Sequence, residues 1–433
     1  MLSTLSRFSL PVRGFVARCL TSWLGSVPEA PPDPILGMDL AFKADTDINK
    51  VNLGVGVYMD DKGNPYTLRC IKSALQSFTD DVKEGIIDLK YCPTAGVPGF
   101  TDAVLPVAYG EQCAALKEER IAAAQVLSGT GGLRVAGEFI KTFAYLEDGS
   151  TPSVYLPNIT WANHKRIFKH SNLNVETYNL YDKPSGSSTL AVDVNAMTSC
   201  MKEAPAGSVF LVHACAHNPT GRDPTQEEWK EITNGLKENG HMVLIDSAYQ
   251  GFASGDLDND AFSIRHMMEQ ELPLMLVQSF AKNFGLYAMR IGALSIVTKS
   301  PAEKKAVMTQ INQIGRGMYS NPPSIGAHVM LKVLSDPTLT EEWHTELLEM
   351  SGRLKLMREG LRARLEKDNV GNRSWDHITD QIGMFCYTGL TTPEIQQLRE
   401  KHIYATDDGR FSIAGLNTTN LDYVATAMKE VLQ

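Results

Sequence analysis

The sequence lacks paired-cysteine motifs and long apolar runs. Its seven cysteines are an odd number and none form a Cys-x-x-Cys pair, so neither a disulfide framework nor a zinc ribbon is expected. Reduced thiols fit a cytosol-like or matrix compartment. No apolar run reaches the roughly 18 residues of a membrane-spanning helix, so we expect no membrane span. The cysteines are Cys19, Cys70, Cys92, Cys113, Cys200, Cys215 and Cys386.

Acidic residues are missing from the start of the chain. None precedes Glu29, whereas Arg7, Arg13 and Arg18 occur there. An acid-poor segment with arginines is typical of a mitochondrial transit peptide, and the arginines interrupt the apolar stretch that a secretory signal needs. We therefore expect residues 1–28 to be a transit peptide and the protein to reside in the mitochondrial matrix. The alternative is a disordered basic tail on a cytoplasmic protein.

The chain also lacks an excess of basic residues. Its net charge is -9 and its pI about 5.6, so nothing global favours nucleic acid as a partner. With 433 residues, 43% hydrophobic and 21% charged, the chain has ordinary globular composition and is long enough for two domains. It contains no internal repeat and no low-complexity tract.

Short apolar runs alternate with helical or loop segments through the middle of the chain. This alternation predicts an α/β fold with a mostly parallel sheet covered by helices on both faces. A periodic segment over 340–367 predicts one long helix that bridges two domains. We expect a large domain over 66–345 and a smaller α/β domain built from 29–65 and 346–433. Strands are expected at 51–58, 121–127, 153–157, 208–213, 242–246, 274–279, 292–297, 382–388 and 411–414, and further helices at 66–87, 98–117 and 420–432.

Ligands of open α/β sheets bind outside the carboxyl ends of the strands, so the residues that follow each strand are informative. The strand at 121–127 leads through Ser128–Gly132 into a helix, which is a plausible phosphate cup, although such a turn is as often just a tight connection. The spacing of these glycines and the absence of an acid after the next strand disfavour a dinucleotide site.

Two further strand ends carry groups of opposite charge. Asp246 ends one strand and needs either a cationic partner or a role as a helix N-cap; Tyr249 follows it. Lys282 follows the next strand beside Phe280 and Phe284, where desolvation would make it nucleophilic, although a single lysine is usually a surface residue. A lysine, an aspartate and a phosphate cup, each after its own strand, are what a pyridoxal phosphate site requires.

Other polar residues have two interpretations each. His213 and His217 have a zinc-like spacing, but the acid of a zinc-binding helix is absent and Asn218-Pro219 disfavours a helix, so no metal is expected. Asn218 instead offers an amide to a phenolic oxygen. Arg316 and Arg410 could each bind a carboxylate in two-pronged fashion or form a structural ion pair.

Ordered sequence blocks from about Trp23 to the C-terminus closely resemble the eukaryotic aspartate aminotransferases. The blocks are PPDPILG (31–37), NLGVGVY (52–58), SGTGGLR (128–134), HACAHNPTG (213–221), DSAYQG (246–251), SFAKNFGLYAMR (279–290), MYSNPP (318–323) and QIGMF (381–385). The resemblance implies the type I pyridoxal phosphate fold and a homodimer with shared sites. It also implies reversible amino transfer between L-aspartate and 2-oxoglutarate, giving oxaloacetate and L-glutamate by a ping-pong mechanism. The alternatives are a broad-specificity aspartate/aromatic aminotransferase and a non-catalytic binding protein.

The resemblance assigns cofactor roles residue by residue. It implies that Lys282 forms the Schiff base with pyridoxal phosphate and shuttles the proton, and that Asp246 keeps the ring nitrogen protonated. Tyr249 and Asn218 bond the phenolic oxygen, and Trp161 stacks on the ring. His164 and His213 support Asp246 from behind. The implied phosphate ligands are Ser128, Gly129, Thr130, Ser279, Arg290 and, from the neighbouring subunit, Tyr91.

The resemblance also assigns the substrate contacts. Arg410 binds the α-carboxylate, the neighbour's Arg316 binds the distal carboxylate and Gly56 lies against the substrate, while Ile35 and Leu36 form an apolar plug. The chain departs from the family pattern at Met289, Ala288 and Gly132, which replace the usual glutamate, glycine and alanine beside the phosphate ligands.

Overall fold

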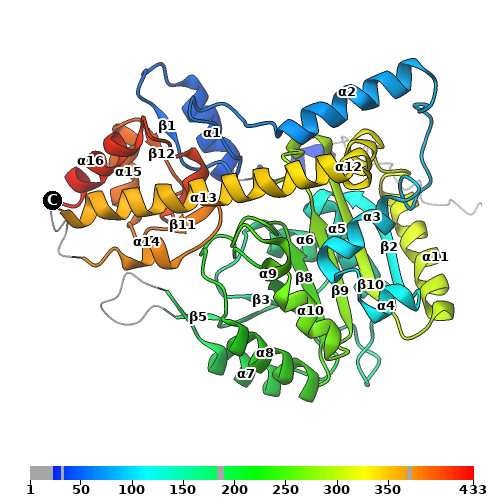
Figure 1. Cartoon of the computed structure of the whole chain (residues 1–433). Helices are drawn as coiled ribbons and strands as arrows, with labels where there is room; N and C mark the ends of the chain where they lie inside the picture. Colours follow the sequence, from blue (N-terminus) through cyan, green and yellow to red (C-terminus); the bar gives the residue numbers. More distant parts are fainter. Residues whose placement is uncertain (1–22, 31–33, 183–189, 368–372) are drawn as a thin grey trace, which may run out of the picture.

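A seven-stranded sheet forms the centre of the computed structural model, which describes residues 23–30, 34–182, 190–367 and 373–433 (Figure 1). The order of the strands in the sheet is β2-β10-β9-β8-β7-β3-β4. Their bounds are β2 Ile121–Leu127, β3 Val154–Pro157, β4 Val175–Tyr178, β7 Val209–His213, β8 Met242–Ser247, β9 Leu274–Ser279 and β10 Ile291–Val297. The predicted α/β class is confirmed.

All neighbouring strands in this sheet run parallel except β10, which is antiparallel to both of its neighbours. The carboxyl ends of the other strands therefore share one edge of the sheet. The register places Asp246 opposite His213 of β7, and Ser279 opposite Gly292 of β10. Residues far apart in the sequence, including Leu127 at the end of β2, thus end their strands at this same edge.

Helices cover both faces of the sheet, as predicted from the alternation. On one face, α5 (Ser128–Phe143) packs on β9 and β10 and is flanked by α6 (Asn163–His170) and α11 (Pro301–Met318). On the other face lie α3 (Phe100–Tyr109), α7 (Val194–Glu203), α8 (Gln226–Glu238) and α10 (Phe262–Glu269). Successive strand residues enter different apolar cores, since Phe210 packs with one and Leu211 with the other, as the two-residue repeat of a strand requires.

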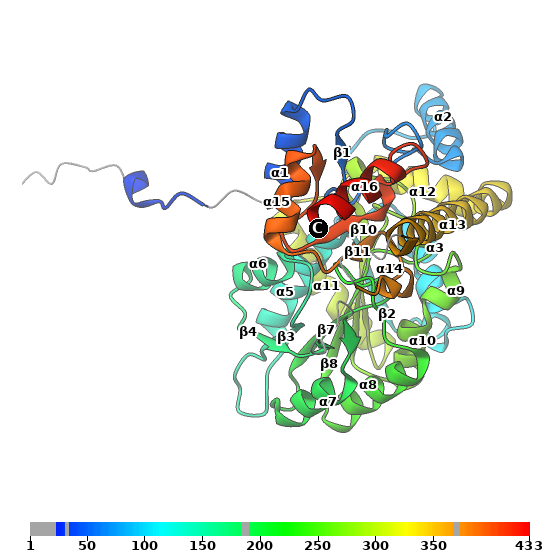
Figure 2. The same cartoon turned by 90° about the vertical axis from the view of Figure 1, so that its left-hand side faces the viewer.

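The long helix α13 (Pro337–Lys367) runs alongside segments from both chain ends (Figures 1 and 2). Here β1 (Val51–Asn52) pairs with β12 (Ile403–Tyr404), and β11 (Phe385–Tyr387) pairs with β13 (Arg410–Ser412). Around them lie α1 (Pro34–Ala44), α14 (Asp376–Asp380), α15 (Thr392–Glu400), α16 (Leu421–Val431) and the turn η4 (Ile413–Gly415). The division into two domains stays a prediction.

The remaining elements are short or peripheral. Helices α2 (Arg69–Lys83) and α12 (Ile325–Ser335) pack on each other and on α13. The others are η1 (Trp23–Ser26), α4 (Ala114–Lys117), β5 (Tyr181–Asp182), β6 (Ala191–Val192), α9 (Leu257–Asp260) and η2 (Tyr287–Met289). Among the described residues, no helix has the length and apolar character needed to cross a membrane.

Two predicted elements were too long. The expected strand 51–58 ends at Asn52, because the Oδ1 atom of that residue accepts hydrogen bonds from Gly54 and Val55 and turns the chain. The expected helix 98–117 is two helices, because the backbone at Gly110 takes a φ of 79° that a helix cannot continue through.

A buried carboxylate joins α2 to α13. Glu346 is fully buried and accepts hydrogen bonds from the Tyr66 hydroxyl at 2.7 Å and from the backbone N–H groups of Arg69 and Cys70 at 2.7 and 3.0 Å. These two N–H groups open α2, where no side chain of the preceding residue caps the helix. Glu346 therefore serves as a remote N-cap for α2.

Substituting Glu346→Ala should lower the free energy of unfolding by about 3 kcal/mol, because it leaves one buried and two partly buried donors without an acceptor. Urea denaturation measures this. Glu349→Ala is the matched control, since Glu349 is exposed and pairs with Arg69 at the surface, and it should cost less than about 1 kcal/mol. Equal losses in the two variants would contradict the capping role.

Candidate active site

The shared edge of the sheet gathers small polar groups beside the start of α5. The Ser128 and Ser279 hydroxyls lie 2.9 Å apart. A Cβ atom built on Gly129 would stand 3.4 Å from the Ser279 Cβ and 3.9 Å from the Asp246 Oδ1. Residues at the ends of three strands, β2, β8 and β9, therefore lie close together and border the predicted cup.

The cup has the features of an anion site. The helix α5 begins at Ser128, and the preceding residue gives no side-chain cap, so the first N–H groups, including those of Gly129 and Thr130, are free of a capping side chain. Ser128 has a φ of 59°, a left-handed value that costs a non-glycine residue conformational free energy. Arg290 also has positive φ, is exposed and donates to the Tyr287 carbonyl at 3.0 Å.

Asp246 stands inside β8 and not at a helix start, so the N-cap interpretation of this residue is wrong. Its side chain is buried, with 8% exposed. Oδ2 lies 3.1 Å from the Nε2 of His164, whereas Oδ1 has no hydrogen-bond partner among the described residues. Burial alone would raise the pKa of Asp246, but the hydrogen bond and charge of His164 outweigh it and hold the pKa below its usual value. Asp246 is therefore a carboxylate with one oxygen free to accept a cationic N–H.

Behind Asp246 runs a chain of hydrogen bonds. The Nδ1 of His164 lies 2.9 Å from the Thr160 hydroxyl, which lies 3.1 Å from the Nε2 of His213. Burial lowers the pKa of His213 to about 3, so this ring is neutral. The hydrogen bond to Asp246 needs a proton on the His164 Nε2, because a carboxylate only accepts. The support that the resemblance implied for His164 and His213 has a geometric basis here.

Lys282 follows β9 and is half-buried, unlike an ordinary surface lysine. Its Nζ stands 5.6 Å from the ring centroid of Tyr249 and 6.0 Å from that of Tyr287. Burial lowers the pKa of Lys282 to about 8; Asp246 opposes the shift, and the nearby guanidinium groups of Arg290 and Arg410 add to it. A substantial share of this amine is thus neutral, as a nucleophile or base requires.

Tyr249 and Asn218 are buried together beside the lysine. The Asn218 Nδ2 donates to the Tyr249 hydroxyl across 3.5 Å. Burial, assisted by the charge of Asp246, raises the pKa of Tyr249, so its hydroxyl keeps its proton and can donate. Trp161 is half-buried and edge-on to His164, which bonds Asp246, with ring centroids 5.3 Å apart.

Arg410 is a buried guanidinium, 5% exposed, with no acidic partner among the described residues. Its Nη2 donates to the Gly54 carbonyl at 2.7 Å, its Nη1 faces the Asn218 Oδ1 at 3.4 Å, and its Nε has no partner. The guanidinium carbon lies 4.4 Å from the ring centroid of Phe385. The ion-pair interpretation of Arg410 is wrong, and a buried cation of this kind suits a carboxylate ligand.

Gly56 lies where only a glycine fits, because a Cβ there would come within 2.8 Å of the Phe385 ring. Phe385, Tyr287 and Thr160 were not singled out from the sequence. Phe385 lay within a block that resembled the family, but no local pattern showed that its ring contacts Gly56 and Arg410.

Two predicted site residues do not join this cluster. Tyr91 is 92% exposed. Arg316 is exposed, has no ion pair among the described residues, and donates to the Ser320 hydroxyl at 2.6 Å and the Asn321 Oδ1 at 3.2 Å. Asn321 in turn donates to the carbonyl of Cys92 at 2.6 Å, so Arg316 and the chain next to Tyr91 form one unit. The side chains of Ile35 and Leu36 lie outside the described residues.

One departure from the family pattern has a packing reason. A Cβ on Gly132 would stand 2.6 Å from a Val277 methyl, so glycine lets α5 approach the sheet. Ala288 is exposed and Met289 half-exposed, and nothing in the structure explains these two. Within the described residues, no group of His, Cys, Asp or Glu side chains could hold a metal ion; the His213 and His217 rings contact each other, with centroids 4.1 Å apart and planes tilted by 45°.

The fold and the site define a class: the pyridoxal-phosphate-dependent aminotransferase fold, with a lysine and a buried acid at the carboxyl edge of a mostly parallel sheet. The chain belongs to the class I and II aminotransferases, whose family model matches residues 48–428. Both the resemblance and the fold predicted from the sequence are confirmed.

Individual relatives span nearly the whole chain. The mitochondrial aspartate aminotransferase of Dictyostelium discoideum is 46% identical over 412 residues, covering 95% of this chain and 93% of the relative. The cytoplasmic aspartate aminotransferase of Saccharomyces cerevisiae superposes with a TM-score of 0.88 at 39% identity, covering 95% and 98%. The aromatic-amino-acid aminotransferase of Burkholderia pseudomallei, covalently bound to pyridoxal phosphate, gives 0.89 at 35% identity, covering 95% and 100%.

The depressed pKa of Lys282 can be measured by trace labelling with an amine-selective reagent and peptide mapping. In the folded protein without cofactor, labelling of Lys282 should rise with pH through about 8, because only the neutral amine reacts. In concentrated urea the same residue should titrate near its ordinary value of 10.5. The same midpoint in both states would show that the fold does not depress this pKa.

Proposed function

We propose that the protein is an aspartate aminotransferase that moves an amino group reversibly between L-aspartate and 2-oxoglutarate by a ping-pong mechanism. This proposal rests on three groups that lie together in one site. Lys282 is a lysine with a lowered pKa, Asp246 has a carboxylate oxygen without a hydrogen-bond partner, and Arg410 is a buried guanidinium without an acidic partner among the described residues. Relatives 41% to 46% identical over nearly the whole chain carry the name aspartate aminotransferase, which supports the substrate.

The cofactor we propose is pyridoxal 5′-phosphate, and the residues present fit it. The free Oδ1 of Asp246 suits a protonated ring nitrogen, and the cup at α5 suits a phosphate. When bound, the cofactor supplies an electron-withdrawing ring joined to the protein through Lys282. The residues proposed to hold it are Ser128, Gly129, Thr130, Trp161, Asn218, Asp246, Tyr249, Ser279, Lys282 and Arg290.

The chain's own residues account for the proton transfer that amino exchange needs. Lys282, with its pKa near 8, can take and return a proton at the substrate α-carbon at neutral pH. Arg410 fixes the α-carboxylate, which makes that transfer a positioned step. Tyr249 and Asn218 orient the reacting group by hydrogen bonding, and Trp161 covers one side of the site.

Specificity for a second carboxylate is assigned to Arg316 of a neighbouring subunit. Arg316 and Tyr91 are exposed, and within the described part of the chain neither forms a hydrogen bond or ion pair with Lys282 or Arg410 of the same subunit. Exposed apolar side chains lie near them in the sequence: Ile86, Leu89, Met318 and Ile325. A homodimer with shared sites would bury exposed apolar surface and bring one guanidinium and one phenol hydroxyl to the neighbouring site.

An aspartate/aromatic aminotransferase is the second candidate, because aromatic aminotransferases superpose on this chain as well as aspartate ones do. Turnover of L-phenylalanine against L-aspartate separates the two. A mitochondrial matrix location is proposed from the acid-poor first 28 residues, most of which lie outside the described ranges, and from relatives named as mitochondrial. A large domain over 66–345 and a small one from 29–65 and 346–433 also remain proposals.

Substituting Lys282→Ala should abolish transamination, because no other amine stands at the α-carbon. It should also remove the visible absorbance of the lysine-bound cofactor. Both are read by absorbance titration with L-aspartate and 2-oxoglutarate, with Lys62→Ala, a change at an exposed lysine, as the control. Normal turnover by the Lys282 variant would refute the function.

Mixing two inactive variants tests the shared site. Lys282→Ala and Arg316→Asp subunits, refolded together in equal amounts, should regain roughly a quarter of the wild-type aspartate activity, because half the dimers are mixed and each mixed dimer has one intact site. If Arg316 served its own subunit, the mixture would show no more than the average of the two homodimers.

A further inference from the structure

A second buried guanidinium lies near the site and has no role yet. Arg358 projects from α13 and is 3% exposed. It donates to the carbonyls of Ile378 at 2.9 Å, Gly383 at 3.0 Å and Phe385 at 2.5 Å. Among the described residues no ion pair joins it to an acid, and its Nε has no hydrogen-bond partner. Its nearest titratable neighbour is the Cys386 thiol.

The carbonyls that Arg358 holds belong to the segment that enters β11. This strand pairs with β13, where Tyr387 stands opposite Arg410 and Phe385 opposite Ser412. The Phe385 ring lies under the Arg410 guanidinium and, 6.0 Å away, edge-on to the Tyr249 ring. Arg358 thus fixes the backbone of a residue whose side chain contacts both a proposed carboxylate ligand and a proposed cofactor ligand.

A role in folding alone does not account for a cation here. Burying a guanidinium without an anion costs several kcal/mol, and apolar replacements of buried charges are often neutral or stabilising. The three carbonyls, however, converge on a single planar fork, which only an arginine offers. We therefore interpret the Arg358 hydrogen bonds mainly as a way to fix the backbone position of Phe385, and only secondarily as a contribution to the stability of the fold.

We propose that Arg358 is a positioning residue for substrate binding, acting through Phe385 and the β11–β13 pair to set the orientation of Arg410. The proposal rests on the proposed aminotransferase function. It predicts that loss of the Arg358 fork weakens the binding of substrate carboxylates, while the proton transfer at Lys282 continues once substrate is bound.

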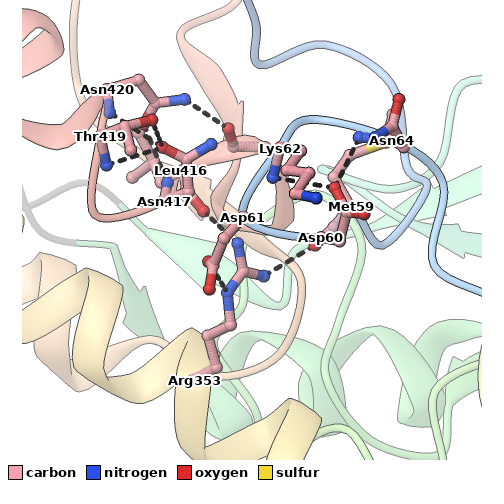
Figure 3. A network of polar contacts seen from close by, with 11 residues as sticks. Met59, Asp60, Asp61, Lys62, Asn64, Arg353, Leu416, Asn417, Thr419 and Asn420 are labelled. Carbon is pink, nitrogen blue, oxygen red and sulfur yellow. Dashed lines mark hydrogen bonds and ion pairs between the residues drawn. The ribbon is translucent and has the colours of Figure 1, made fainter.

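The experiment compares Arg358→Met and Arg358→Lys with Arg353→Met in the cofactor-loaded dimer. Arg353 is a matched control, since it also projects from α13 and donates to two carbonyls, those of Met59 and Leu416, and it pairs with Asp61 (Figure 3). No hydrogen bond joins it to β11 among the described residues. The readouts are kcat, KM for L-aspartate and for 2-oxoglutarate, and the dissociation constant of succinate, a dicarboxylate that cannot react. Circular dichroism checks that each variant is folded at the assay temperature.

For Arg358→Met we expect KM for both substrates, and the succinate constant, to rise roughly tenfold, with kcat changed less than about threefold. Arg358→Lys should recover part of the loss, because an ammonium can hold one or two of the three carbonyls. A fall in kcat at unchanged KM, or an equal rise of KM in Arg353→Met, would overturn the proposal. If the wild-type protein binds succinate but does not turn over aspartate, the proposed function fails, and succinate binding still decides the role of Arg358.

Discussion

The active site depends on one buried carboxylate, that of Asp246. It can stay charged in the interior because His164 donates to it and is itself oriented by Thr160 and His213. The hydrogen bond from His164 uses a single oxygen, and among the described residues the other oxygen has no partner. This asymmetry fixes where a cationic ring nitrogen would sit. It also constrains the approach of Lys282, since Asp246 lies near the end of β8 and Lys282 follows the adjacent strand β9.

Helix α13 contacts both the segment that holds Lys282 and the segment beside Arg410, the arginine proposed to bind substrate. Near its start, Trp343 donates to the carbonyl of Asn283, the residue after Lys282. About four turns further along the same helix, Arg358 holds the backbone of Phe385 beside Arg410. A helix is stiff over this length, so α13 acts as a spacer that sets the separation of Lys282 from Arg410. The geometry of the site is therefore maintained by residues that do not touch a ligand.

The sequence was informative where chemistry follows strand ends. The positions of Lys282, Asp246 and the α5 cup followed from the rule that ligands bind at the carboxyl edge of a parallel sheet. The sequence was less informative where local hydrogen bonds of the backbone determine where an element ends. The strand at 51–58 was predicted too long because its hydrophobic pattern does not show the hydrogen bonds from Gly54 and Val55 to the Asn52 side chain.

Long-range packing explains the residues that were missed. Phe385 and Arg358 carry no local signal of function, since one resembles a core aromatic and the other a surface arginine on a long helix. Their roles arise from a strand pairing between segments more than twenty residues apart, β11 with β13. Arg316 shows the converse. Its residue type suggested a carboxylate ligand, but the fold places it at an exposed surface. Among the described residues it does not contact the candidate active site of its own chain. A dicarboxylate site divided in this way would link recognition of the second carboxylate to assembly, because a single chain provides only Arg410.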